Sequence, residues 1–257
     1  YLTGSGRSDW FSTLATPGRD NKLSVFYPAV SASFVFTELW KPSFLSFGKL
    51  RAGYAVVGQG ALPFKTQLYY NLRSETINGS PIGNIVNPSI PNPTLFASKA
   101  KEFEVGTEMR LFGDRLNLDL TWYNKKSSDE ILDVPTSTTT GYSGATLNIG
   151  ELQNKGIEAL VSGVILKSKD FSWTSSVNGS YNDNKVITLA PGTASQLLAT
   201  SRSNVGFLQN IAGKAAGQVM AYDFKYDTNG NILKDANGAP ERGELKSYGS
   251  AYSKWTA

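Results

Sequence analysis

Three carboxylates at even spacing are the residues of this sequence best suited to acid–base chemistry. Glu102, Glu104 and Glu108 alternate with mostly apolar residues and are followed, at the same parity, by Arg110. Pairs of carboxylates act as acid, base or nucleophile in glycosidases. Charged residues on one face of a strand are also common as a simple hydrated surface, and we prefer this interpretation. We therefore expect no catalytic residue, and we do not expect an enzyme.

The composition excludes most other catalytic and metal sites. The 257 residues include no histidine and no cysteine, which removes the commonest general base, the usual triad, disulfides and nearly every ordinary zinc or copper site. Asp227–Asn231 is similar to a calcium loop, but Ile232 stands where such a loop needs glycine and Gly238 where it needs glutamate. The sequence predicts hairpin turns there instead, and we expect no metal and no cofactor.

The charge balance and the apolar segments exclude two further classes of protein. Twenty-five basic and 21 acidic residues give a formal charge of +4, and because no Lys/Arg run occurs we expect no nucleic-acid partner. No segment approaches the ~18–20 apolar residues of a membrane helix. The first ten residues lack the features of a signal peptide. Since the chain begins like the middle of a strand and stops abruptly after residues 252–257, we expect a piece of a longer polypeptide.

The charged residues belong to a segment, residues 101–126, that predicts an antiparallel hairpin. Apolar and polar residues alternate before and after a tight turn at residues 112–115, and a period of two places successive side chains on opposite faces of a sheet. The apolar face carries Leu118, Leu120 and Trp122. The polar face would line a lumen if the sheet closed into a barrel, and its candidate lumen-lining residues are Glu102, Glu104, Glu108, Arg110, Asn117, Asp119 and Tyr123.

The lengths of the connections favour a transmembrane β-barrel over a soluble sandwich. Strand-like alternation also occurs in residues 1–7, 25–37, 49–57, 154–166 and 171–182, whereas the chain beyond Lys185 is loop-like. Tight connections (38–48, 112–115, 167–170) alternate with long ones (8–23, 58–100, 127–150), as in outer-membrane barrels with short periplasmic turns and long extracellular loops. We predict an all-β fold, part of a large antiparallel transmembrane barrel of about seven strands, as one domain over residues 1–257.

Aromatic residues in the long loops are candidates for contact with a ligand or a partner, because aromatic rings stack on sugars and anchor protein interfaces. Local packing within the loop is the alternative for each of them. The candidates are Trp10, Phe11, Tyr69, Tyr70, Tyr142, Tyr222 and Tyr226.

Several short motifs follow one another in a specific order. They are an Asn-Pro-rich loop, Lys101-x-Phe103-x-Val105-Gly106, Leu116-Asn117-Leu118-Asp119-Leu120-x-x-Tyr123-Asn124-Lys125-Lys126-x-x-Asp129, Val134-Pro135, Thr139-Thr140-Gly141-Tyr142, Asn148-Ile149-Gly150-Glu151-Leu152-x-Asn154-Lys155-Gly156-Ile157-Glu158 and Phe171-Ser172-Trp173. Together they resemble the barrel of SusC/RagA-type TonB-dependent outer-membrane transporters over roughly residues 1–189, and more weakly beyond. Phe96-Ala97-Ser98 departs from the Trp-Glu that this family usually has shortly after its Asn-Pro motif.

The resemblance implies an importer of oligosaccharides or peptides in the outer membrane of a Gram-negative bacterium. It implies as partners the membrane lipid, a SusD-like surface lipoprotein, the solute, and TonB through a plug domain. The family's plug, TonB box and closing C-terminal strand are not in this sequence.

Two alternatives stay open. One is a siderophore-type receptor. The other is a soluble β-sandwich adhesin or carbohydrate-binding module, which would bury Leu118, Leu120 and Val177 against a second sheet instead of exposing them to lipid.

Overall fold

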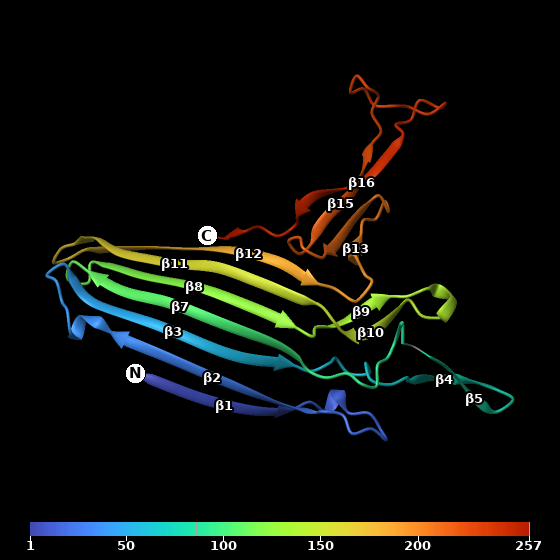
Figure 1. The fold of residues 1–257 in the computed structure, drawn as a ribbon, viewed down its shortest axis with the longest axis horizontal. Coiled ribbons are helices and arrows are strands. Elements are labelled where there is room, and N and C mark those ends of the chain that lie inside the picture. The colour runs from blue at the N-terminus through green and yellow to red at the C-terminus, as the bar shows by residue number, and fades with distance from the viewer. Residues whose placement is uncertain (86, 257) are drawn as a thin grey trace.

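One long antiparallel sheet dominates the computed structural model, which describes residues 1–85 and 87–256 (Figure 1). Its strand order is β1-β2-β3-β7-β8-β11-β12-β17, so each strand pairs with the next long strand along the chain. The bounds are β1 (Leu2–Trp10), β2 (Ser24–Val35), β3 (Leu45–Gln59), β7 (Ser98–Leu111), β8 (Leu116–Ser128), β11 (Glu151–Lys167), β12 (Ser172–Thr188) and β17 (Trp255–Thr256). This is a section of a large antiparallel barrel wall, as predicted.

The central hairpin agrees with the sequence analysis. β7 and β8 pair from Lys99 opposite Ser128 to Leu111 opposite Leu116 without a register shift. The turn between them has a left-handed backbone at Phe112 (φ 55°), Gly113 (φ 65°) and Asp114 (φ 65°). Glycine and aspartate tolerate this conformation, which matches the right-handed twist of the two strands.

Short and long connections lie at opposite ends of the sheet (Figure 1). At one end, residues 112–115 join β7 to β8, and residues 168–171 join β11 to β12. At the other end the connections span residues 11–23, 60–97 and 129–150. The 13 residues of β8 extend over roughly 40 Å at about 3.3 Å per residue, which exceeds the ~25 Å apolar band of a membrane barrel even at a tilt of ~45°. The strands therefore continue beyond such a band towards the long loops.

The two faces of the sheet differ in polarity. Val105, Trp122, Ile157, Tyr181 and Trp255 are successive cross-strand partners on one face, which we call the outward face. Directly opposed residues of an antiparallel pair point to the same side, so this row is apolar across five strands. It needs an apolar environment, and lipid supplies one in a barrel.

The exposure of three outward residues decides between barrel and sandwich. Val177 is 69% exposed and Leu120 is 38% exposed, while Leu118 is half-buried by its neighbours in the sheet. Over residues 1–85 and 87–256 no second sheet covers them, which contradicts the sandwich alternative. Among these residues there is also no helix with the length and apolar character to span a bilayer.

The long loops contain regular structure of their own. β4 (Tyr70–Ile77) and β5 (Ser80–Ile85) form a projecting hairpin, and β6 (Ser89–Ile90), β10 (Gly144–Asn148) and β9 (Ile131–Pro135) form a three-stranded sheet. The described part of the connections also contains the 3₁₀ turns η1 (Ser12–Leu14) and η3 (Thr138–Thr140) in the long loops, and η2 (Phe36–Glu38) in the short connection between β2 and β3. A small hydrophobic cluster joins these loops to the sheet; it contains Leu14, Val25, Tyr27, Ala61, Leu95 and Ala97.

The prediction of a loop beyond Lys185 is wrong. This segment forms a second antiparallel sheet of β13 (Ser195–Thr200), β14 (Gly206–Ile211), β15 (Gln218–Phe224) and β16 (Arg242–Ser250), which rises from the long sheet in Figure 1. Its strands are short and their alternation is weak, so tertiary pairing outweighs the local pattern. The two predicted turns are confirmed: the Gly230 amide donates to the Asp227 carbonyl at 3.1 Å, and the Gly238 amide donates to the Asp235 carbonyl at 3.0 Å.

Gly156 is needed for close packing in the centre of β11. A Cβ at this position would overlap the Tyr181 carbonyl oxygen, and it would stand 2.5 Å from the Tyr123 hydroxyl oxygen. We expect Gly156→Ala to lower the free energy of unfolding of the full-length protein by about 1–3 kcal/mol, the usual cost of overpacking. Urea-induced unfolding in a detergent or lipid bilayer measures it.

Gly163→Ala is the matched control in the same strand, because its Cβ would meet nothing closer than 3.5 Å. Equal effects of the two substitutions would contradict the steric explanation.

Candidate functional site

The polar residues predicted to line a lumen lie together on the face opposite the outward one, which we call the polar face. Glu104 is directly opposite Tyr123, and Glu108 is opposite Asp119. The other pairs of this hairpin on the same side are Glu102 with Lys125 and Arg110 with Asn117. All seven candidates therefore share one face of β7 and β8, as the alternation predicts.

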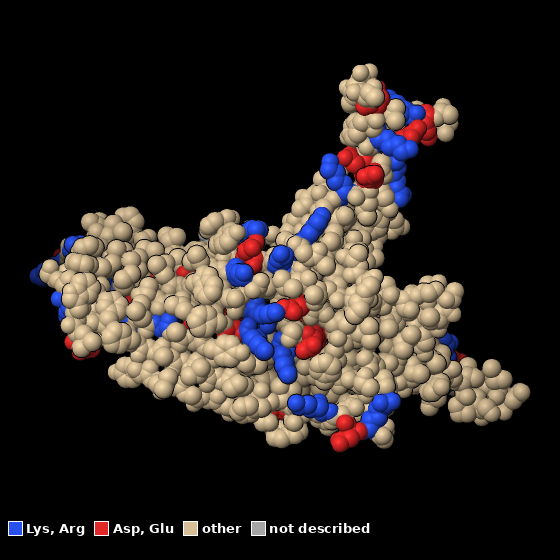
Figure 2. Space-filling view, in the orientation of Figure 1, with Lys and Arg blue, Asp and Glu red and all other residues tan. Residues whose placement is uncertain are grey.

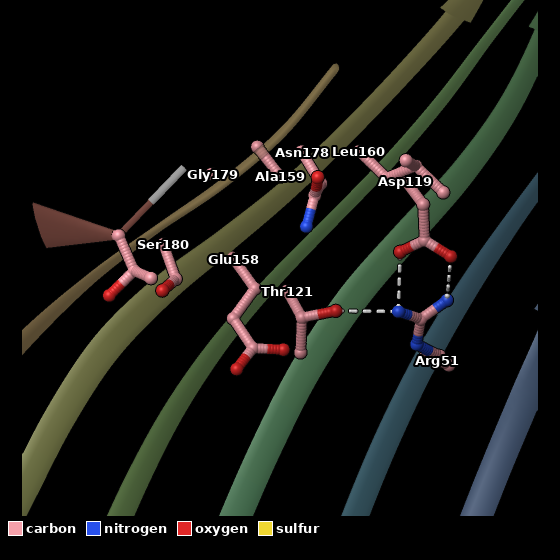
Figure 3. A pocket seen from close by; sticks show the side chains of 10 residues that line it. Arg51, Asp119, Thr121, Glu158, Ala159, Leu160, Asn178, Gly179 and Ser180 are labelled. Carbon is pink, nitrogen blue, oxygen red and sulfur yellow. Dashed lines mark hydrogen bonds and ion pairs between the residues drawn. The ribbon is translucent and has the colours of Figure 1, made fainter. Parts of the chain in front are cut away.

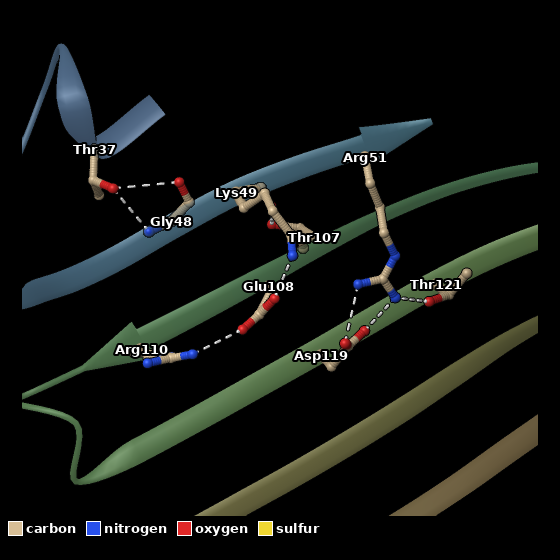
Figure 4. Close-up of polar contacts among 9 residues, drawn as sticks. All are labelled: Thr37, Gly48, Lys49, Arg51, Thr107, Glu108, Arg110, Asp119 and Thr121. Carbon is tan, nitrogen blue, oxygen red and sulfur yellow. Dashed lines mark hydrogen bonds and ion pairs between the residues drawn. The ribbon is translucent and has the colours of Figure 1, made fainter. Parts of the chain in front are cut away.

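An arginine that the sequence analysis did not single out organises the centre of this face. Arg51 of β3 donates from Nη1 to Asp119 Oδ2 at 3.0 Å, and from Nη2 to Asp119 Oδ1 and Thr121 Oγ1, each at 2.5 Å (Figure 4). A bidentate arginine–carboxylate pair fixes orientation as well as charge. The contact reaches across β7, where Gly106, which lies between Arg51 and Thr121 in the register, leaves room for the guanidinium group.

A second ion-pair group lies beside the first, closer to the short turns. Lys49 Nζ lies 2.7 Å from Glu108 Oε2, and Arg110 Nη2 lies 3.4 Å from Glu108 Oε1 (Figure 4). A third pair, Lys125 with Glu102 at 3.7 Å, lies on the other side of Arg51, towards the long loops. These charges are half-exposed, so each pair contributes little to stability, about 0–1 kcal/mol. They link side chains of β3, β7 and β8 on the polar face.

A shallow pocket of about 640 Å³ opens next to Arg51 on the polar face (Figure 3). Glu158 of β11 and Asn178 and Ser180 of β12 line it together with Asp119 and Thr121. Further towards the long loops, the Tyr123 hydroxyl donates to Asn182 Oδ1 at 3.1 Å. The pocket offers two carboxylates, the Arg51 guanidinium, an amide and hydroxyl groups, a set that suits a hydrated polar solute through hydrogen bonds and charge.

The signal for Arg51, Lys49 and Glu158 was present in the sequence. Arg51 falls at the polar parity of its strand, and Lys49 and Glu158 occupy equivalent positions in β3 and β11. The alternation places them on the correct face. It does not reveal which carboxylate each residue meets, because that depends on the register between strands.

The aromatic candidates of the loops do not form one cluster. Trp10 is exposed at the end of β1, whereas Phe11 packs against the hydrophobic cluster. Tyr142 is half-buried near η3. Tyr222 packs in β15 with its ring 5.9 Å from that of Phe207 and 3.3 Å from Arg242 Cζ, while Tyr226 is half-exposed beside it.

Tyr69 and Tyr70 do come together, in a pocket of about 420 Å³ among the long loops. Phe64 packs edge-on against Tyr69 with ring centroids 4.4 Å apart, and the Phe64 backbone is left-handed at φ 68°. The side chain of Asn87 closes the pocket, because it accepts from the Tyr69 amide at 3.2 Å and donates to the Phe64 carbonyl at 3.3 Å. Strained backbone of this kind concentrates at functional sites, which makes this pocket a candidate binding site. We call it the loop pocket.

An ion pair between Lys65, which lines the loop pocket, and Asp133 fixes the loop at its edge. Lys65 Nζ donates to Asp133 Oδ2 at 2.6 Å, and Thr146 Oγ1 donates to Asp133 Oδ1 at 2.6 Å. Burial raises the pKa of Asp133, but the hydrogen bonds from Lys65 and Thr146 and the charge of Lys65 outweigh it, so the pKa lies below its ordinary value. The pair joins the loop before β4 to the small sheet of β6, β10 and β9. Among the residues that the structure describes, no cluster of carboxylates is arranged to hold a metal ion.

Comparison with known proteins gives a family match along nearly the whole chain. The model of the family described as TonB dependent receptor-like, beta-barrel matches residues 1–253. TonB-dependent receptor P26 of Formosa agariphila is 31% identical over 192 residues, which are 73% of this chain and 19% of that protein. TonB-dependent receptor SusC of Bacteroides thetaiotaomicron is 26% identical over 239 residues, 86% of this chain and 24% of that protein. The chain thus spans about a fifth to a quarter of the length of these relatives.

Solved structures show the same fold. The RagAB peptide importer in its open-open state superposes with a TM-score of 0.74 at 19% sequence identity, over 100% of this chain and 28% of that chain. A structure of the RagAB peptide transporter gives a TM-score of 0.73 at 21% identity, over 99% of this chain and 27% of that chain. At these identities the likeness concerns the fold alone.

The Lys65–Asp133 pair predicts a pH-dependent stability of the loop pocket. Because the folded pKa of Asp133 is depressed, the pair stabilises the loops at pH values above the unfolded pKa of about 3.9. This stability is lost as the pH falls through the folded pKa. We expect Asp133→Asn to reduce local stability at pH 7 by about 0.5 kcal/mol, and to have no effect once the parent carboxylate is protonated.

Amide hydrogen exchange in residues 60–97 and 129–150 of the full-length protein, normalised for the intrinsic pH dependence, measures this difference. Asp170→Asn, in the short turn at the opposite end of the sheet, is the control and leaves these loops unchanged. An effect of Asp133→Asn that does not diminish as the pH is lowered from 7 through the folded pKa of Asp133 would refute the ionic explanation.

Proposed function

We propose a role in import across the outer membrane, starting from the fact that this chain belongs to the TonB-dependent receptor-like β-barrel family. The chain would form part of the barrel wall of a Gram-negative nutrient importer. The whole protein would also contain a plug that contacts TonB, a proposal supported by the TonB dependence that the names of the relatives state for those proteins.

The observation that carries this proposal is the two-faced sheet with its sorted connections. Outward residues such as Leu120 and Val177 are apolar and exposed, and the polar face carries paired charges. A polar solute crosses a lipid bilayer only where a protein replaces the lipid with a polar wall. The long loops gather at one end of this wall, where an importer must capture its solute.

The ion pairs of the polar face suit a passage that does not retain its cargo. Arg51 and Asp119 neutralise each other, as do Lys49 and Glu108, so the wall offers hydrogen bonds without a strong field of either sign. Conduction requires binding weak enough for release. We infer that the polar face is a hydrated path or a seat for the plug, and that it performs no chemistry on the solute.

For the solute we propose an oligosaccharide or a peptide. The loop pocket presents the rings of Phe64, Tyr69 and Tyr70 beside backbone and amide groups, a combination that stacks on sugar rings or apolar peptide side chains. RagAB, which shares the fold of this chain, is a peptide importer, and this supports the peptide. A SusD-like surface lipoprotein would cover the long loops and complete the binding site.

Uptake by cells that produce the full-length protein tests this function. We expect saturable uptake of a labelled oligosaccharide or peptide that stops when a proton ionophore removes the energy supply. Tyr70→Ala should raise the half-saturation concentration about fivefold, which corresponds to the loss of about 1 kcal/mol of ring contact.

Leu72→Ala is the matched control, since Leu72 is 71% exposed in the same strand, close to the 69% of Tyr70, and lies outside the loop pocket. Uptake of a ferric chelate in place of both solutes would instead support a siderophore-type receptor.

Labelling of single cysteines tests the membrane placement. The chain contains no cysteine, so Leu118→Cys, Leu120→Cys and Val177→Cys each introduce one thiol on the outward face. We expect these thiols in the full-length protein to react with a probe dissolved in the membrane and to resist a water-soluble reagent. Ser180→Cys, on the polar face beside the pocket of Arg51, is the control without access to lipid. Rapid labelling of Leu120→Cys by the water-soluble reagent would contradict the placement of the outward face in lipid.

A further inference from the structure

A band of lysines on the outward face is not explained by the proposed transport path. Lys101 lies on the same side of β7 as Val105, four residues away, and Lys126 lies on the same side of β8 as Trp122, also four residues away. The same parity holds for Lys155 in β11 and Lys185 in β12, relative to Ile157 and Tyr181. Lys99 and Lys254 extend the set. We call these six residues the lysine band.

The lysine band lies directly beyond a row of aromatic residues. Phe103 packs against Trp122 with ring centroids 6.2 Å apart, and Tyr181 packs against Trp255 with centroids 4.8 Å apart. Two to four residues separate these rings from the lysines on the same strands, which is about 7–13 Å along a strand. Aromatic rings of this type mark the boundary between hydrocarbon and head groups. The lysines would then stand at the depth of the head groups, on the side of the long loops.

The space-filling view shows how charged side chains are distributed over this surface (Figure 2). A broad area with few charged side chains covers the sheet between the short turns and its middle. Blue Lys and Arg side chains gather at the limit of this area, with red Asp and Glu side chains among them, and the long loops begin beyond them.

The positive charge of the band is only partly compensated by protein carboxylates. Lys126 pairs with Glu151, and Lys254 pairs with Asp183. Within residues 1–85 and 87–256, no ion pair involves Lys99, Lys101, Lys155 or Lys185. Within the band, four side chains are exposed to solvent: Lys101, Lys126, Lys155 and Lys185. Lys155 is the cross-strand partner of Asp183, so the uncompensated positive charge of the band comes mainly from Lys99, Lys101 and Lys185.

Two of these lysines are placed where charge repulsion costs stability. Lys101 and Lys126 are direct cross-strand partners, so their Cβ atoms lie about 4.5–5.5 Å apart. Like charges directly opposite each other destabilise a sheet. Glu151 already neutralises Lys126 in part, whereas no carboxylate pairs with Lys101 among the described residues. An anion bound beside Lys101 contacts both ammonium groups and offsets the repulsion that remains between them.

We propose that the lysine band binds the phosphate groups of anionic lipid head groups in the leaflet on the side of the long loops. The apolar outward face beside it selects a lipid over a free anion, because the acyl chains lie along that face while the phosphate meets the lysines. This inference rests on the membrane location proposed above. The proposed site binds particular head groups, whereas the remainder of the outward face makes only nonspecific contact with acyl chains.

Lipid titration of the purified full-length protein tests the proposal. The protein in a neutral detergent receives lipid A, which carries two phosphates, or phosphatidylcholine, or inorganic phosphate, and native mass spectrometry and thermal unfolding report binding. We expect lipid A to bind preferentially, and Lys101→Gln and Lys126→Gln each to weaken its binding roughly fivefold. Lys234→Gln, an exposed lysine between the two turns of the β15–β16 connection, leaves binding unchanged.

The sign of the stability change separates a lipid site from a purely structural role. In neutral detergent alone Lys101→Gln should raise the unfolding temperature, because it removes the repulsion with Lys126. With saturating lipid A the same substitution should lower it relative to the parent. A change of the same sign in both conditions overturns the proposal, as does lipid A binding that neither substitution weakens.

Three further outcomes are distinct. Equal stabilisation by inorganic phosphate alone would overturn the lipid as the source of the phosphate. Absence of the full-length protein from the outer-membrane fraction would refute the proposed function itself. Cell fractionation reveals this before the lipid titration begins. A membrane-integrated protein whose lysines do not respond to lipid A would refute only this inference.

Discussion

Continuous backbone pairing between neighbouring strands is the constraint on which the rest of this structure depends. A bilayer contains no water to satisfy a free amide or carbonyl, so a spanning sheet must pair every such group within the protein. The long strands from β1 to β12 each pair with their neighbours over most of their length. This explains why the strands are long and why their connections are confined to the two ends.

The pairing also determines the chemistry of each face. Since side chains alternate, a register that aligns Val105, Trp122 and Ile157 on one side must align Glu104, Tyr123 and Gly156 on the other. A slip of one residue in a single strand would move its charges into lipid and its apolar residues into the polar face. The bidentate contact of Arg51 with Asp119 spans two strand intervals, and so it discriminates against such a slip even though its net contribution to stability is small.

The surface chemistry of the sheet changes along the direction of its strands. Near the short turns its outward face is apolar, in the middle its polar face holds paired charges, and towards the long loops lysines and aromatic rings project outward. Beyond the sheet, the loops fold through their own small sheets, the hydrophobic cluster and the Lys65–Asp133 pair. Loops held by such contacts present a pocket such as that of Phe64, Tyr69 and Tyr70 with a smaller ordering cost on binding than unstructured loops.

The sequence by itself determined the long sheet, the central hairpin and the side on which each polar candidate lies, because period-two alternation and turn residues are local signals. Only the tertiary structure decided that Arg51 meets Asp119, that Lys101 stands opposite Lys126, that Tyr69 and Tyr70 share a pocket while Tyr222 does not, and that residues 195–250 form a sheet. These facts depend on register and on contacts between residues distant in the chain. Alternation gives the parity of a residue but not its partner, because every even shift of register preserves the same two faces.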